Sequence, residues 1–92
     1  PVKTAAISPG AGKSMIGVAH SLGVDVIITG DIDHHTGIDA VADGLLVIDA
    51  GHYGIEHIFT EEISEYLSKA LSERGENIDL IMEPLHSPFH VV

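Results

Sequence analysis

The chain alternates short apolar runs with longer stretches whose apolar residues recur three and four positions apart. The short runs are rich in β-branched residues, which favour the extended backbone, and they predict strands at residues 3–8, 24–29, 45–49 and 77–82. The first two longer stretches predict helices at residues 13–22 and 36–43. Glycines and a Pro-Gly turn separate these elements, as expected at the ends of strands and helices.

The clearest predicted element is a long helix with one apolar face. Counted from Ile55, its apolar positions have offsets of 0, 3, 4, 8, 11, 12, 15 and 16, and the residues are Ile55, Ile58, Phe59, Ile63, Tyr66, Leu67, Ala70 and Leu71. This spacing matches the ~3.6-residue period of an α-helix. Gly75 is the expected stop.

The resulting order is β-α-β-α-β-α-β, which is typical of an α/β protein with a mostly parallel sheet covered by helices. We expect residues 1–92 to form a single α/β domain. Four parallel strands make a small sheet with exposed edges. The chain is therefore also expected to be part of a larger α/β unit.

Composition limits the possible functions. The 92 residues carry a formal charge of −10 and no cysteine, which argues against nucleic acid or anionic membranes as partners and excludes disulfides. The longest apolar run is four residues, Leu45–Ile48, too short to cross a membrane. The first residues show no signal-peptide pattern, so we expect a cytoplasmic protein. Seven histidines beside fourteen acidic residues make metal binding worth testing.

Three unusual segments follow the first three predicted strands, at residues 8–14, 30–35 and 49–56. In a parallel α/β sheet, the carboxyl ends of the strands meet at one edge, where ligands usually bind. In the first segment, Gly12-Lys13-Ser14 resembles the end of a phosphate-binding loop, but Ile7 stands where that motif needs glycine. A tight strand-to-helix turn and a helix start that holds an anion both remain open.

The second segment contains Asp33-His34-His35, which looks like the triplet of a phosphoesterase family. That triplet directly follows a strand and accompanies upstream Asp motifs, and both features are missing here. A solvated loop and the wall of a His-rich site are the other interpretations.

In the third segment, His52 and Glu56 lie four residues apart at the start of the long helix. Side chains at this spacing share a helix face and can bind one cation together or two cations separately. A helix-capping carboxylate beside a chance histidine is the alternative.

Taken together, the motifs resemble the carboxyl-terminal part of the NIF-three-like dinuclear-metal-centre family, whose members are often labelled GTP cyclohydrolase I type 2 homologues. The similar residues are Val26 to His35 with Gly30-Asp31, Ile38-Asp39-Ala40, Gly44 to Tyr53 with Gly51-His52-Tyr53, Glu56, the turn from Ser8 to Ser14, and Pro88-Phe89. The similarity therefore covers essentially the whole chain, in order.

This resemblance implies that His52 and Glu56 are metal ligands and that His35 lies near the metals, with Asp31 in support. It also implies two divalent ions (Zn, Mn or Fe), a hexameric ring and a small, perhaps nucleotide-like, substrate for hydrolysis. The family's remaining ligands, a His-His pair and an Asp, belong to an amino-terminal half that has no counterpart here. Gly54-Ile55 replaces the family's common Ala-Thr without changing the ligand spacing.

We therefore expect the carboxyl-terminal half of a metal-dependent hydrolase, inactive and weakly metal-binding when alone. In the complete site, two cations about 3.5–4 Å apart would activate a shared water. Asp31 or His35 would then move protons or orient a ligand. A regulatory or scaffold module with a His-rich edge for a partner or an anion is the alternative of a different class. A phosphate-binding domain that uses Gly10 to Ser14, with Lys13, is the third.

Overall fold

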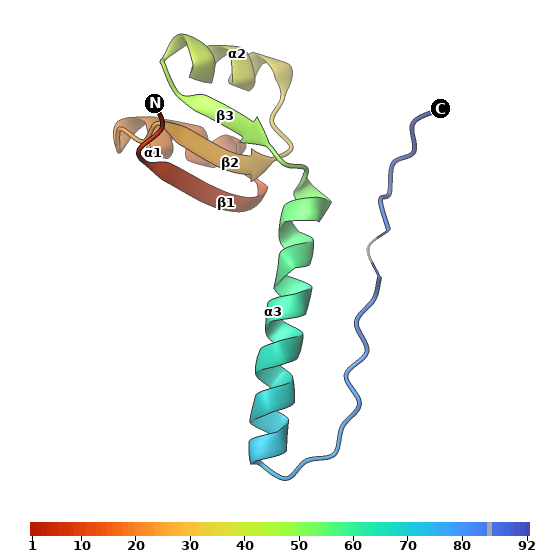
Figure 1. Cartoon of the computed structure of the whole chain (residues 1–92). Helices are drawn as coiled ribbons and strands as arrows, with labels where there is room; N and C mark the ends of the chain where they lie inside the picture. Colours follow the sequence, from red (N-terminus) through yellow and green to blue (C-terminus); the bar gives the residue numbers. More distant parts are fainter. Residues whose placement is uncertain (85) are drawn as a thin grey trace. The chain divides into compact units, whose positions relative to one another are not determined.

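A computed structural model describes residues 1–84 and 86–92 and divides into two compact units, Pro1–Ile55 and Glu56–Val92 (Figure 1). The first unit contains a three-stranded parallel sheet in the order β1-β2-β3. Its strands are β1 (Ala5–Ala11), β2 (Val26–Gly30) and β3 (Leu46–Asp49). The predicted parallel α/β fold is confirmed, with consecutive strands as neighbours in the sheet.

Helices connect the strands of the first unit. A short 3-10 turn, η1 (Lys13–Met15), leads into α1 (Ile16–Ser21), and α2 (His34–Ala42) joins β2 to β3. Right-handed crossovers that step in the same direction put their helices on the same face of a sheet. The contacts agree with this rule, because α1 touches both β2 and α2, and α2 touches β3.

The core of the first unit lies between these helices and the sheet. Its buried cluster joins α1, β2, α2 and the start of β3 through Ala19, Ile27, Ala40 and Leu45. Ile27 and Leu45 are each 1% exposed, while small alanines face them from the two helices. A short side chain lets a helix backbone approach the sheet closely, so small residues on the helices leave room for the large residues of the sheet.

The first strand extends beyond the prediction. A turn was expected from Pro9 to Gly12, but β1 continues to Ala11, with an irregular register between Ile7 and Ala11. Gly10, at φ 71°, takes up the irregularity in the left-handed region that glycine tolerates. The irregular strand reaches the end of β2, where the Gly12 amide donates to the Gly30 carbonyl at 3.1 Å.

The long helix α3 (His52–Glu73) is continuous across the boundary between the two units. It begins three residues before the first predicted apolar position, Ile55. Its end matches the prediction, because Gly75 at φ 73° closes a turn in which the Glu76 amide donates to the Leu71 carbonyl at 3.0 Å. This is the usual glycine-containing end of a helix.

The predicted fourth strand is wrong. Residues 77–82 have no regular secondary structure, and Ile81 in the middle of the run is 92% exposed. An apolar run becomes a strand only when another strand accepts its backbone hydrogen bonds, and a sequence pattern cannot show whether such a partner is present. Within the described ranges, no helix combines the length and apolar character needed to span a bilayer.

Candidate functional site

The three predicted segments leave the sheet side by side at the carboxyl ends of the strands. Parallel pairing continues to the end of β2, with Ala11 opposite Gly30 and Thr29 opposite Asp49. Beyond β3, the Ala50 amide donates to the Thr29 carbonyl at 2.7 Å. The expectation that these segments share one edge of the sheet is therefore confirmed.

A short polar contact at this edge joins two of the predicted site residues. His52 Nδ1 lies 2.6 Å from Asp31 Oδ2, although the two residues are 21 positions apart in the sequence. A carboxylate in its ionised form can only accept a hydrogen bond, and with that form at Asp31 the donor is Nδ1. In the neutral ring, this tautomer leaves the lone pair on Nε2, which is the atom that would bind a metal ion.

The backbone around Asp31 is shaped for this contact. A Cβ atom added to Gly30 would lie 2.5 Å from the backbone nitrogen of His52, so a side chain there would collide with the start of α3. Asp31 itself has φ 53°, and it is the non-glycine residue with positive φ among those described. Such a conformation costs about 1 kcal/mol or more, and it often marks functional sites. Glycine and aspartate thus bring the Asp31 carboxylate to the imidazole of His52.

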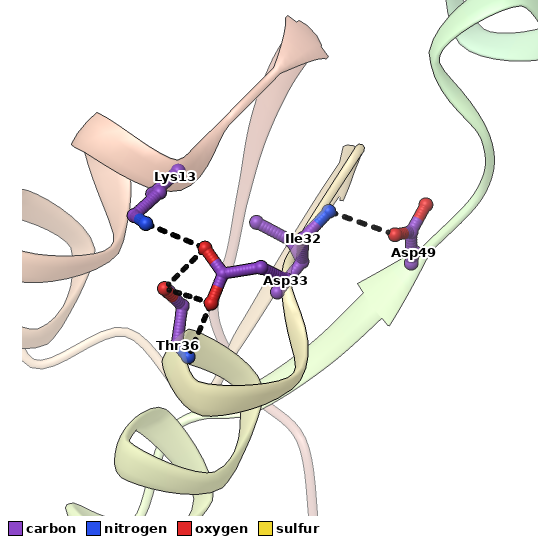
Figure 2. A network of polar contacts seen from close by, with 5 residues as sticks. All are labelled: Lys13, Ile32, Asp33, Thr36 and Asp49. Carbon is purple, nitrogen blue, oxygen red and sulfur yellow. Dashed lines mark hydrogen bonds and ion pairs between the residues drawn. The ribbon is translucent and has the colours of Figure 1, made fainter.

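A second carboxylate, Asp49, connects the loops that carry this pair. Its Oδ2 accepts from the Ile32 amide and its Oδ1 accepts from the Gly51 amide, both at 3.0 Å (Figure 2 shows the bond to Ile32). These amide hydrogen bonds stabilise the charged form and lower the pKa of Asp49. No role was predicted for Asp49 from the sequence. An aspartate two residues before a glycine is typical of an Asx-turn, and that signal was available.

Asp33 has a structural role at the start of α2 (Figure 2). Its carboxylate accepts from the amide and hydroxyl of Thr36 at 3.0 Å and pairs with Lys13 Nζ at 2.6 Å. The Lys13 contact and the Thr36 hydrogen bonds hold the pKa of Asp33 well below its usual range. Asp33 is thus a helix N-cap, a role that its position before an apolar-periodic stretch could have indicated. The phosphate-binding alternative needs the positive charge of Lys13, and this charge is already paired with the Asp33 carboxylate.

The histidines of the second segment lie in the first turn of α2 rather than in a loop. The rings of His34 and His35 meet edge to face, with their centroids 5.8 Å apart. Both side chains are exposed. The structure therefore puts His35 at the carboxyl edge of the sheet, as the second residue of the helix that Asp33 caps.

Helix α3 contains two pairs of His and Glu at the same spacing. His52 and Glu56 form the first pair, and His57 and Glu61 form the second. Each pair lies on one helix face because its members are four residues apart. Spacing alone therefore does not select a ligand pair. The carboxylate of Asp31 at His52 Nδ1 distinguishes the first pair, since metal-binding imidazoles usually donate their other nitrogen to a carboxylate or carbonyl.

The predicted site residues are only partly assembled. Asp31 and His52 are in contact, whereas no group of three or more His, Asp or Glu side chains suited to a metal ion occurs in the described part of the chain. His52 and Glu56 both belong to α3, at its first and second turns.

Known proteins resemble this chain both in sequence and in fold. The family model described as Duf34/NIF3 (NGG1p interacting factor 3) matches residues 1–87. The chain therefore belongs to the Duf34/NIF3 family. It is 44% identical over 91 residues to a protein of Streptococcus pneumoniae named GTP cyclohydrolase 1 type 2 homolog. A protein of the same name from Halalkalibacterium halodurans is 33% identical over 89 residues.

Solved structures support the same assignment. The Bacillus cereus protein related to NIF3 superimposes with a TM-score of 0.89 and 30% identity over 99% of this chain. The Staphylococcus aureus hypothetical protein SA1388 gives a TM-score of 0.88 and 33% identity. The chain corresponds to 34% of the length of the pneumococcal relative and 25% of the Bacillus cereus structure. The resemblance inferred from the motifs is confirmed at the level of the family and the fold.

Proposed function

We propose that this chain supplies one wall of a divalent-metal centre in a hydrolase that acts on a small, perhaps nucleotide-like, molecule. His52 and Glu56 hold metal in this proposal, and further ligands come from an amino-terminal half that lies outside these 92 residues. The observation that carries the proposal is the contact between His52 Nδ1 and Asp31 Oδ2 at 2.6 Å.

The donor set fits such a centre. A neutral imidazole with its lone pair on Nε2 and a carboxylate one helical turn away are ligands that Zn, Mn and Fe accept. The chain offers no thiolate, because it has no cysteine, so softer metal centres are disfavoured. The relatives' name, GTP cyclohydrolase 1 type 2 homolog, is consistent with hydrolysis but leaves the reaction of this chain as a proposal.

The residues of the chain have separate tasks in this mechanism. His52 and Glu56 bind, Asp31 holds the His52 imidazole in one tautomer and orientation, and His35 moves a proton or orients the substrate from the first turn of α2. When bound, divalent ions would polarise the substrate and lower the pKa of water toward about 7. Two ions, a ring-shaped hexamer and a cytoplasmic location remain predictions that accompany this proposal.

The proposal is tested by replacing the two proposed ligands and comparing the metal binding of this variant with that of a matched variant on the same helix. The double variant His52→Ala, Glu56→Ala is expected to lose Zn²⁺ or Mn²⁺ binding, measured by calorimetry and metal analysis of the longest polypeptide that carries this sequence. The control double variant His57→Ala, Glu61→Ala removes the same chemical groups at the same spacing and should keep its metal. Equal loss in both variants would contradict the proposal.

The isolated 92-residue chain provides a second test. With two ligand side chains on one helix, it should bind these metals weakly and show no turnover. Tight binding of two ions per chain would overturn the interpretation as an incomplete site. If the ligand variant kept both its metals and its biological effect, the alternative of a regulatory or scaffold module would be favoured instead.

A further inference from the structure

The Asp49 carboxylate touches the neighbours of both members of the Asp31–His52 pair. Ile32, which donates to Oδ2, directly follows Asp31, and Gly51, which donates to Oδ1, directly precedes His52. Each oxygen therefore fixes the backbone of one of the two loops. A single side chain at the end of β3 is thus hydrogen-bonded to both loops.

We infer that Asp49 is a positioning residue that sets the distance between Asp31 and His52 and thereby the tautomer in which His52 meets a metal ion. We call the two hydrogen bonds of Asp49 to Ile32 and Gly51 the Asp49 clasp. The inference rests on the proposed function only where it concerns the metal. The effect of the clasp on the tautomer of His52 is argued from the hydrogen bonds of Asp49 and the contact between Asp31 and His52.

Sequence separation explains why a clasp is needed. Strands β2 and β3 are paired as far as Thr29 and Asp49. Beyond this pair, one further backbone hydrogen bond, from the Ala50 amide to the Thr29 carbonyl, connects the two segments. Asp31 and His52 lie past this bond, and both are partly exposed, at 58% and 42% of their side chains. An exposed contact between two side chains holds them together weakly, so the backbone must keep them in register.

Charge is essential to the clasp. A carboxylate offers two acceptor oxygens to two amide donors, and hydrogen bonds to an ionised acceptor are stronger than neutral ones. The side-chain amide of asparagine has a single oxygen, and its NH₂ group would face one of the two donors. Asp49→Asn therefore keeps the size of the residue but can keep at most one of the two bonds.

The chain contains a matched control at the opposite end of the sheet. Asp25 lies just before β2, and its Oδ2 accepts from the amides of Lys3 and Thr4 at 2.8 Å and from the Thr4 hydroxyl at 2.9 Å. It is also a carboxylate held by backbone amides, but it is remote from His52 along the strand. Asp25→Asn should disturb the entry to β1 and β2 without altering the imidazole.

The experiment reads the tautomer of His52 by long-range ¹H–¹⁵N correlation spectra of the purified protein, at a pH about two units above the ordinary histidine pKa of ~6.5. The unsubstituted protein and Asp25→Asn should show the proton on Nδ1. Asp49→Asn should shift the population toward the Nε2–H form that unconstrained imidazoles favour in water. An unchanged tautomer in Asp49→Asn would overturn the inference.

A second variant covers the case in which Asp49→Asn fails to fold. Asp49→Ser retains an acceptor for the Gly51 amide, as in a Ser turn, but is too short to reach Ile32 as well. It should also release the tautomer. If its spectrum matched that of the unsubstituted protein, the bond to Ile32 would have no positioning role, and the inference would fail.

Metal titration separates this inference from the proposed function. With Zn²⁺ alone as the probe, Asp49→Asn should bind about 10-fold more weakly, the lower end of the loss seen when an outer partner of a ligand is removed. A shifted tautomer with no Zn²⁺ binding by any variant, measured on the longest polypeptide that carries this sequence, would support the clasp and overturn the proposed function. A 10-fold loss with an unshifted tautomer would overturn the clasp and leave the proposed function standing.

Discussion

The two units of the chain differ in how they bury apolar residues. In Pro1–Ile55, Ile27 and Leu45 are 1% exposed and helices cover one face of the sheet. In Glu56–Val92, three large apolar side chains of α3 are mostly exposed, with Ile58 at 61%, Phe59 at 66% and Tyr66 at 68%. In both units, helices form where the spacing of apolar residues predicts them. The buried cluster of apolar side chains lies in the first unit.

This difference separates periodicity from packing. The strands of the first unit gain stability because Ile27 and its neighbours leave water, at about 25 cal/mol per Å² of apolar surface. In α3, the backbone hydrogen bonds are internal to the helix, and an isolated helix is only marginally stable in water. The site residues Asp31 and His52 belong to the unit with the core, which can hold them in a defined geometry.

The largest effect is expected at the centre of this core. Ile27→Ala should lower the free energy of unfolding by about 3–4 kcal/mol, because it removes buried methyl groups and leaves a cavity. Hydrogen exchange of the β2 amides would measure the loss. A loss below ~1 kcal/mol would mean that the first unit is not organised around Ile27.

A somewhat smaller loss is expected where two backbones approach. A Cβ atom at Gly12 would lie 1.9 Å from the Thr29 hydroxyl oxygen, which is fully buried and cannot move aside easily. Gly12→Ala should therefore cost about 2–3 kcal/mol by overpacking. The control Gly17→Ala, in α1 with nothing within 4 Å of the new atom, should be neutral or stabilising by up to ~1 kcal/mol. Denaturant unfolding of both variants compares them directly.

The corresponding substitution in the second unit should hardly change the free energy of unfolding. Phe59→Ala removes a large side chain that is 66% exposed, and exposed substitutions usually change stability by less than ~0.5 kcal/mol. Alanine is also the better helix former. Hydrogen exchange of the α3 amides should therefore change little. A cost near that of Ile27→Ala would show that α3 has a packed partner in solution and would break the comparison.

The smallest effect concerns the ion pair of Lys13 and Asp33. The lowered pKa of Asp33 contributes stability above the ordinary aspartate value of ~3.9, and this contribution is lost as the pH falls through the folded pKa. No change is therefore expected between pH 5 and 8. Carboxyl ¹³C titration should show an Asp33 midpoint below ~3.9, and Lys13→Met should raise it. An unmoved midpoint would assign the lowered pKa to Thr36 alone.

Much of the first unit was predictable from the sequence. The β-branched runs at 24–29 and 45–49 became β2 and β3, and the helical spacing at 13–22 and 36–43 became η1 with α1, and α2. The run at 77–82 has the same apolar character but formed no strand. The contrast has a physical cause, since β2 and β3 each bond to a neighbouring strand, and that pairing is a tertiary property.

The candidate site was predictable in its members but not in its contacts. The sequence by itself determined that Gly30-Asp31 and Gly51-His52 follow strands of one sheet and that His52 and Glu56 share a helix face, because local propensity and periodicity depend on neighbouring residues. Only the tertiary structure decided that Asp31 turns to His52 through a left-handed backbone, and that Asp49 links the two loops. Contacts between residues some twenty positions apart depend on strand register and loop shape, and no local pattern encodes these.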